Sequence, residues 1–250
     1  MKAIILCAGY ATRLYPLTEN QPKGLLPLNN KPILNYLMEQ LEDVEELNEA
    51  ILISNHKFYK HFGDWSNLYN GRIKVKVLDD GTTSNEDRLG AIGDIQFVID
   101  KENIDEDIIV VASDNYFRFK LKEFYSFYKS KNQDSVLAEE FPDEKLEYLV
   151  NNFGVAKLDE NDRVLSIVEK PRKDIGSNTA VWATYFYTKS TVKLIKTYLE
   201  EGNSKDSPGN FPAWLCQRKP VFAFRTKKPC VDIGTIEQYR ALDDELSNRK

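Results

Sequence analysis

A turn of small residues follows the first apolar run of the chain and ends in a cation. Ala3–Cys7 is continuously apolar, and the turn after it contains Gly9 and Arg13. Small residues let backbone N–H groups approach phosphate oxygens, and a guanidinium adds a planar, permanently charged fork of donors. The turn has a single glycine and matches neither common glycine-rich phosphate loop. Phosphate binding and simple tight packing are therefore equal alternatives at this point.

A second cation and a carboxylate could complete a phosphate site. Lys23 lies in Pro22–Pro27, and two cations on one loop can neutralise a triphosphate, although a lysine in such a loop is more often solvated. Asp114 follows the apolar run Ile108–Ala112. Mg²⁺ typically takes one or two carboxylates together with phosphate oxygens. The alternative for Asp114 is a turn aspartate that bonds its own backbone.

Hydrophobic patterning predicts the elements that would position these residues. Ala3–Cys7 is typical of a strand buried on both faces of a parallel sheet. A helix is expected to open at Pro32, and Ala50–Ser54 is a second buried strand, which gives a βαβ unit. The apolar stripe of that helix consists of Ile33, Leu37, Leu41 and Val44. Ligands bind at the carboxyl ends of such strands, where the turn with Gly9 is expected.

The alternation of helices and strands continues along the chain. Helices are expected near residues 57–68, 88–99, 192–199 and 235–246, and strands near 73–78, 108–112, 136–139, 153–158, 164–169 and 181–187. This order predicts an α/β, Rossmann-like, doubly wound fold with a mixed, mainly parallel sheet and antiparallel additions at one edge. The length fits a single catalytic domain over residues 1–250.

Composition narrows the partners and the compartment. The chain has 34 Lys and Arg against 39 Asp and Glu, a net charge of −5, which argues against nucleic acid as a partner. Cys7, Cys216 and Cys230 form no CxxC pair and fit free thiols in a reducing cytoplasm. The apolar run at the N-terminus is too short to span a membrane. We therefore expect a cytoplasmic protein with no membrane partner.

Three segments together resemble the signature of the sugar-phosphate nucleotidyltransferases. They are Leu6–Thr18, Pro22–Pro27 and Lys31–Ile33. That family includes glucose-1-phosphate thymidylyltransferases, mannose-1-phosphate guanylyltransferases and related cytidylyltransferases. The resemblance extends to about Leu246, and it implies a Mg²⁺-dependent enzyme that uses a nucleoside triphosphate. We expect no left-handed β-helix extension of the kind that some relatives carry.

The resemblance implies roles for the first loop. In the family, the glycine-rich turn and its arginine, here Arg13, hold the β- and γ-phosphates, and the lysine of the PK motif, here Lys23, approaches the reacting phosphates. The implied nucleotide-binding residues of the turn are Ala8, Gly9, Ala11 and Thr12. Relatives often have glycine at the position of Ala11. If this position needs a positive φ, we expect a strained alanine.

Two further motifs imply the metal site. Ser113–Asn115 is similar to the family's GDN-like motif, whose aspartate binds the catalytic Mg²⁺, and Val231–Thr235 is similar to its DxGT motif. The resemblance therefore implies that Asp114 and Asp232 are catalytic residues and metal ligands. Relatives often have Trp at the position of Cys230, so we expect altered packing beneath the site.

The base and the acceptor are less well defined. Leu89–Gly93 resembles the turn that reads the base, which implies nucleotide binding at Gly90, although a glycine for helix packing fits almost as well. Residues 82–88 do not match the thymidylyltransferase pattern, so CTP, UTP, dTTP and GTP stay open. Glu169 and Lys170 match the family's EKP motif, which implies contacts to the sugar and its phosphate. The segment with Trp182 and Ala183 resembles the strand that lines the sugar in the family, which implies substrate binding by these two residues, and relatives usually have glycine at the position of Ala183.

The resulting hypothesis is a nucleotidyltransferase that transfers a nucleoside monophosphate from a nucleoside triphosphate to a sugar 1-phosphate. The aromatic residues Trp182, Tyr185 and Trp214 leave a cytidylyltransferase for phosphocholine or another phosphoalcohol as an alternative, because aromatic faces attract quaternary ammonium groups. A non-catalytic nucleotide sensor on the same fold is a second alternative. The sequence leaves the oligomeric state open, a homo-oligomer included.

Overall fold

The described chain forms two compact units. The computed structural model describes residues 1–227 and 230–248, without the side chains of Asp143 and Asp232. The first unit contains residues 1–88, 111–122 and 230–248, and the second contains residues 89–110 and 123–227. The single catalytic domain expected from the sequence stays a prediction. Among the described helices, none combines the length and the apolar character that a membrane span requires.

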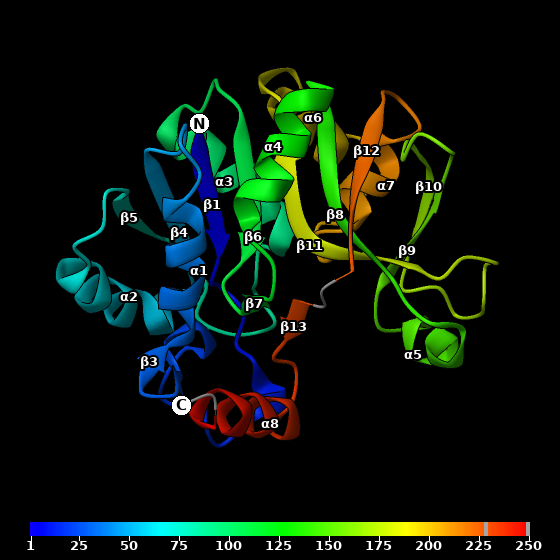
Figure 1. Cartoon of the computed structure of the whole chain (residues 1–250). Helices are drawn as coiled ribbons and strands as arrows, with labels where there is room; N and C mark the ends of the chain where they lie inside the picture. The colour runs from blue at the N-terminus through cyan, green and yellow to red at the C-terminus, as the bar shows by residue number, and fades with distance from the viewer. Residues whose placement is uncertain (228–229, 249–250) are drawn as a thin grey trace. The chain divides into compact units, whose positions relative to one another are not determined.

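The first unit is built on parallel strands with helices between them (Figure 1). Its elements are β1 (Lys2–Leu6), β2 (Pro27–Leu28), β3 (Lys31–Pro32), α1 (Ile33–Glu42), β4 (Glu49–Ser54), α2 (His56–Leu68), β5 (Lys74–Asp79), the end of β6 (Ile108–Ala112), β7 (Asn115–Phe117), β13 (Cys230–Asp232) and α8 (Ile236–Ser247). Two short 3₁₀ helices, η1 (Thr12–Leu14) and η2 (Lys23–Leu25), interrupt the loop after β1. The sequence therefore predicts the βαβ order correctly.

The parallel strands place their carboxyl ends at one edge. β1 pairs with β4, and β4 pairs with β5, both parallel and in continuous register. The backbone N–H of Ser113, directly after β6, donates to the carbonyl of Leu6 at 3.2 Å. The central residues of β1 and β4 are fully buried, which is why their sequences are continuously apolar. The loops after β1 and β6 consequently begin beside each other.

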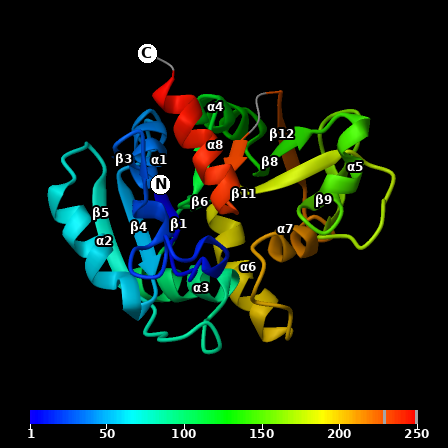
Figure 2. The same ribbon diagram turned by 90° about the horizontal axis from the view of Figure 1, so that it is seen from below.

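A two-stranded ladder and a capped helix hold the C-terminal segment against this edge. β7 and β13 pair antiparallel, and Thr235 caps α8 by accepting from the N–H of Gln238 at 3.2 Å. α8 lies beside the N-terminal segment that carries β2 and β3 (Figures 1 and 2), and Leu242 and Leu246 pack there. The other buried members of this cluster are Leu14, Leu26, Leu28, Ile33 and Ile233. The loop after β1 is thus anchored to a packed core.

The second unit contains a mainly antiparallel group of strands. Its elements are α3 (Ala91–Glu102), the start of β6, α4 (Leu121–Lys131) from residue 123, β8 (Asp134–Glu140), η3 (Asp143–Lys145), α5 (Leu146–Leu149), β9 (Gly154–Leu158), β10 (Val164–Glu169), β11 (Thr179–Tyr187), α6 (Lys189–Glu200), α7 (Asn210–Leu215) and β12 (Val221–Thr226). β11 pairs antiparallel with β8 and β9, and β9 pairs antiparallel with β10. β12, which the sequence did not predict, pairs parallel with β8.

The fold class expected from the sequence is confirmed, because parallel strands are combined with antiparallel ones and connected by helices. The bounds differ in places for identifiable reasons. The helix expected from residue 88 begins at Ala91, because Gly90 has φ 81° and lies outside helical geometry. Pro32 is the N-cap of α1, and Val44 lies beyond the end of that helix, although it is fully buried.

The cap of α8 provides a test of this arrangement. Thr235→Ala removes the side-chain oxygen that accepts from Gln238, so we expect a loss of about 1 kcal/mol in the free energy of unfolding and a melting temperature lower by roughly 2–4 °C. Thermal unfolding followed by circular dichroism measures this change. Thr235→Ser keeps an accepting hydroxyl and should stay near the original stability. Equal destabilisation by both variants would show that the hydroxyl is not what stabilises α8.

Candidate active site

The loop after β1 is held in place by residues that follow β4 and β5. The side-chain amide of Asn55 donates to the carbonyl of Ala8 at 2.9 Å, while its oxygen accepts from the N–H of Phe58 at 3.0 Å and so caps α2. The hydroxyl of Tyr10 lies 3.3 Å from the carbonyl of Thr82. Asn55 is fully buried. Sequence reasoning missed its second role, although an asparagine between a strand and a helix is a recognisable N-cap signal.

Ala11 adopts the left-handed conformation, with φ 48° and ψ 41°. The left-handed conformation costs an L-residue roughly 1–2 kcal/mol, so the strain expected from the sequence is present. The fully buried Thr18 stabilises the turn, because its hydroxyl donates to the carbonyl of Ala11 at 2.8 Å. The N–H of Leu14 donates to the same carbonyl at 2.9 Å and begins η1. The turn is therefore a defined structure that two hydrogen bonds at one carbonyl keep closed.

The exposed side of this turn offers donors and one cation. Gly9, Thr12 and Arg13 are exposed, whereas Ala8 is buried. Within the described part of the chain, Arg13 has no hydrogen-bond or ion-pair partner. A Cβ placed on Gly9 would meet no atom within 4 Å, so the space above this residue is open. The turn thus presents backbone and an uncommitted guanidinium to solvent, as an anion site requires.

Lys23 and Asp114 form an ion pair that joins the loop after β1 to the loop after β6. Their side chains are only 13% and 22% exposed, respectively. Gly24 makes the close approach possible, because a Cβ at this position would lie 3.2 Å from the hydroxyl of Ser113. Two residues predicted independently from the sequence are therefore in contact, and one of them is the carboxylate expected to bind metal.

Asp232 is brought to the same place through its backbone. In the ladder of β7 and β13, the Cα of Asp232 lies opposite that of Asn115, the residue next to Asp114. The side chain of Asp232 lies outside the described residues. The antiparallel ladder hence brings together the backbones of two motifs that are far apart in sequence. From the sequence, only the family resemblance indicated that these motifs meet.

Gly90 belongs to the second unit, and the backbone conformation and packing of this unit explain why glycine is required at this position. Its φ is 81°, and a Cβ there would lie 2.6 Å from the carbonyl oxygen of Lys205. Both facts exclude a larger residue without strain. The backbone that approaches Gly90 is therefore the chain's own, which agrees with the packing alternative considered from the sequence. Nucleotide binding at Gly90 stays a prediction.

Glu169 and Lys170 lie at the end of β10 in the second unit. The Cα of Glu169 is opposite that of Gly154 on β9. Burial raises the pKa of the Glu169 carboxyl, while the charge of Lys170 and a hydrogen bond from Ser207 oppose this shift. Lys170 is exposed and has φ 44°, an uncommon conformation for a residue that precedes proline. Such strain is concentrated at functional sites, so it supports a role for this motif.

Trp182 and Ala183 lie on β11, where its pairing with β8 is irregular. The register shifts between Val181 and Tyr185, and bulges of this kind often re-aim side chains near active sites. Trp182 is 5% exposed, and its indole N–H donates to Glu139 at 3.1 Å. Ala183 is partly exposed. Trp182 is thus a core residue with a satisfied donor.

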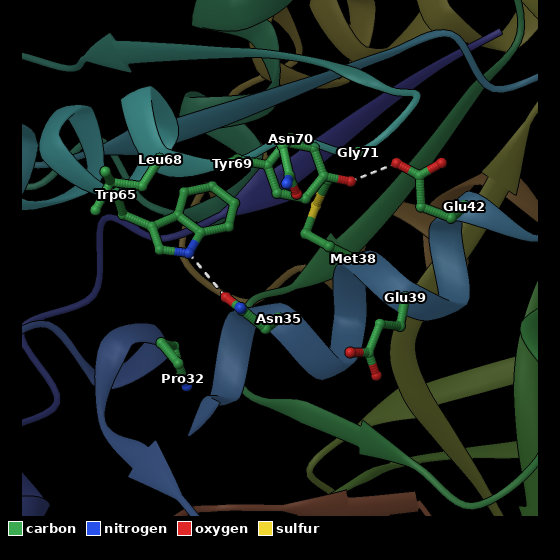
Figure 3. A pocket seen from close by; sticks show the side chains of 10 residues that line it. All are labelled: Pro32, Asn35, Met38, Glu39, Glu42, Trp65, Leu68, Tyr69, Asn70 and Gly71. Carbon is green, nitrogen blue, oxygen red and sulfur yellow. Dashed lines mark hydrogen bonds between the residues drawn. The ribbon is translucent and has the colours of Figure 1, made fainter. Parts of the chain in front are cut away.

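A pocket of about 430 Å³ in the first unit lies between α1 and the end of α2 (Figure 3). Two hydrogen bonds join polar groups of its lining: the indole of Trp65 donates to Asn35 at 2.8 Å, and the hydroxyl of Tyr69 donates to Glu42. No predicted site residue lines it. The lining residues are Pro32, Asn35, Met38, Glu39, Glu42, Trp65, Leu68, Tyr69, Asn70 and Gly71. Without a cationic side chain, this pocket is unsuited to phosphates.

Comparison with known proteins gives consistent matches over the whole chain. The family model described as nucleotidyl transferase matches residues 2–249. A Sulfolobus acidocaldarius protein, named provisionally as a mannose-1-phosphate guanyltransferase, is 29% identical and covers 100% of this chain. The bifunctional protein GlmU of Methanocaldococcus jannaschii is 31% identical over 82% of this chain. The chain spans 64% and 45% of the lengths of these two relatives.

The fold is also found among solved structures. The crystal structure of UDP-glucose pyrophosphorylase complexed with UDP-glucose matches with a TM-score of 0.82. The match covers 100% of this chain and 99% of that chain, at 20% sequence identity. At this identity the likeness establishes the fold, and it agrees with the architecture expected from the sequence.

The strained turn at Ala11 generates a stability prediction. Ala11→Gly relieves the left-handed strain but adds conformational entropy to the unfolded chain, so we expect a net gain of about 0.5–1 kcal/mol in the free energy of unfolding. Chemical denaturation measures it. The matched control is Ala241→Gly, at an exposed position inside α8, which should lose about 1 kcal/mol. If both variants lose stability, Ala11 is not strained in solution.

Proposed function

The chain belongs to the nucleotidyl transferase family, and on this premise we propose that it transfers a nucleoside monophosphate from a nucleoside triphosphate to a sugar 1-phosphate. The observation that carries the proposal is the contact between Lys23 and Asp114, beside the backbone of Asp232. A cation and two carboxylate-bearing positions then converge next to an exposed turn suited to anions. The name of the relative from Sulfolobus acidocaldarius, which refers to mannose 1-phosphate, supports this acceptor class.

The chemical step is an exchange of bonds at phosphorus. An oxygen of the acceptor phosphate forms a bond to the α-phosphorus, and the bond between that phosphorus and the oxygen bridging to the β-phosphate breaks. The products are the nucleoside diphosphate sugar and pyrophosphate. Because a phosphate monoester is already ionised near neutral pH, the step needs no general base. Catalysis then depends on positioning and on neutralising negative charge.

The cationic side chains supply this neutralisation in our proposal. Arg13, exposed and without a partner among the described residues, holds the β- and γ-phosphates and then the departing pyrophosphate. Lys23, fixed by its ion pair, lies against the reacting phosphates. The nucleotide's phosphates contact the turn through Ala8, Gly9, Ala11 and Thr12. Glu169 binds hydroxyl groups of the acceptor, and Lys170 binds its phosphate.

The donor set around Asp114 fits Mg²⁺. Carboxylate oxygens are the protein ligands that this ion prefers, and one carboxylate or two, with phosphate oxygens, are its usual complement. Asp114 and Asp232 would hold the ion. When bound, it would add positive charge beside the reacting phosphates. The pairing of Asp114 with Lys23 also fits, because the ion pair holds this partly buried carboxylate in place beside the loop after β1.

The aromatic residues favour a sugar phosphate over phosphocholine as the acceptor. A choline site needs open aromatic faces around one point. Trp182 and Tyr185 are 5% and 2% exposed, and the guanidinium of Arg218 covers the ring of Trp214 at 3.9 Å. These three rings therefore offer no free cage for a quaternary ammonium group. We also propose a cytoplasmic location, which suits three buried cysteines that are not joined by disulfides.

A pyrophosphate-release screen tests the proposed reaction. Purified protein with Mg²⁺ is mixed with CTP, UTP, dTTP, GTP or ATP and a panel of sugar 1-phosphates and phosphoalcohols. We expect release with at least one sugar 1-phosphate, dependent on both substrates and abolished by a chelator. Release with phosphocholine alone would favour the phosphoalcohol alternative. No release with any pair, despite nucleotide binding, would favour the sensor.

The role of Asp114 has a direct test. Asp114→Asn removes the charge that faces Lys23, and we expect turnover to fall by about 10²–10³-fold, the size of effect seen when one electrostatic contact is lost from an active site. Steady-state pyrophosphate release measures this fall. Asp64→Asn is the matched control, because Asp64 is an exposed residue of α2 that pairs with Lys60. A folded Asp114→Asn variant with normal turnover would refute the metal assignment.

A further inference from the structure

One short segment of the second unit contacts two predicted site residues. It comprises residues 205–209, the last part of the connection between α6 and α7 (Figure 2). Its backbone meets the turn at Gly90, and its far end meets the side chain of Glu169. Neither contact was expected from the sequence, because residues 205–209 match no motif. Both contacts lie within the second unit.

The first contact is made by two carbonyl groups. The carbonyl of Lys205 accepts from the N–H of Ile92 at 2.9 Å, and that of Asp206 accepts from the N–H of Ala91 at 3.2 Å. These are the first N–H groups of α3, which a helix leaves without internal partners. The segment therefore caps α3 and fixes the turn that contains Gly90. Phosphate binding by the same N–H groups is excluded while this cap is in place.

The second contact is made by Ser207 and Gly209. Ser207 acts as a side-chain hydrogen-bond donor that lowers the pKa of the Glu169 carboxyl. A Cβ placed on Gly209 would lie 2.1 Å from an oxygen of that carboxylate, and a Cβ on Gly154 would lie 2.8 Å from the same oxygen. Gly209 has φ −69°, which any residue adopts. Glycine is consequently needed at this position for space and not for conformation.

The surroundings of Glu169 act on the pKa of its carboxyl in opposite directions. Burial raises the pKa of its carboxyl, while Lys170 and Ser207 lower it. A hydrogen-bond donor to the ionised form favours that form. Ser207 thus acts against the effect of burial and favours the ionised form, which accepts hydrogen bonds from ligand hydroxyl groups.

We infer that residues 205–209 are a positioning segment for the acceptor, in which Ser207 and Gly209 orient the carboxylate of Glu169 toward a ligand rich in hydroxyl groups. The same segment anchors the turn at Gly90 through its backbone carbonyls. The inference rests on the proposed function and deepens it, because it assigns selection of a polyhydroxyl acceptor to a segment outside the recognised motifs. Ser207 and Gly209 act through Glu169 and are not themselves catalytic residues.

The test compares four variants of the full chain. Ser207→Ala removes the donor, Ser207→Thr keeps it, and Gly209→Ala fills the space that the carboxylate occupies. Ser204→Ala is the matched control, because Ser204 is an exposed serine of the same connection. Its backbone carbonyl accepts from the hydroxyl of Tyr198, and this bond does not involve the side chain that the substitution removes. KM for the acceptor, KM for the nucleotide, kcat and the melting temperature are measured for each variant.

We expect Ser207→Ala to raise the acceptor KM about tenfold, the effect of losing one hydrogen bond to a charged group, with nucleotide KM unchanged. Loss of the donor also raises the pKa of Glu169, so the acid limb of the acceptor kcat/KM profile should move to higher pH. Ser207→Thr should restore both properties. Gly209→Ala should raise the acceptor KM by more than tenfold. Unchanged acceptor KM and acid limb in a folded Ser207→Ala variant would overturn the inference.

A measurement without turnover separates this inference from the proposed function. Carboxyl ¹³C NMR follows the titration of Glu169 in the original chain and in Ser207→Ala. A higher pKa in the variant supports the contact whether or not pyrophosphate is released. If the original chain releases no pyrophosphate with any pair, the proposed function fails and the positioning role fails with it. If pyrophosphate is released but neither the titration nor the acceptor KM changes, only the positioning role fails.

Discussion

The ion pair between Lys23 and Asp114 is the contact on which the candidate site depends. It joins loops that follow two different strands, and both partners are mostly buried. Removing the two charges from water has a desolvation penalty, and the attraction between them offsets this penalty only when the geometry is fixed. The geometry is held by the fit of Gly24 against Ser113 and by the hydrogen bond from Ser113 to Leu6. Parallel strands that end at one edge make both contacts possible.

The C-terminal segment completes this arrangement from far away in the sequence. Three residues of β13 pair with three of β7, and the capped helix α8 follows immediately. The leucines of α8 pack on the residues that flank η1 and η2. The helix α8 therefore stabilises the loop after β1 and also anchors β13, the strand that contains Asp232. Loss of this packing would disturb both the loop after β1 and the position of Asp232.

Much of the fold could be predicted from the sequence, because buried parallel strands leave continuous apolar runs such as Ala3–Cys7 and α1 leaves an apolar stripe. Lys23, Asp114 and Arg13 could be singled out by type and position. The ladder of β7 and β13 could not be predicted, since strands of three residues leave no periodic signal and their partner is remote. The contact of Ser207 with Glu169 is equally invisible, because it depends on long-range packing and on an absent Cβ at Gly209.

The conformation of Ala11 has a consequence for ligand affinity. The turn is held by the hydrogen bond of Thr18 to Ala11 and by that of Asn55 to Ala8, neither of which involves a ligand. A flexible loop loses conformational freedom when it closes on an anion, and that loss weakens binding. Here the loss is incurred during folding. We infer that the turn is preorganised. The binding free energy of a triphosphate would then be reduced little by loss of conformational entropy in the loop.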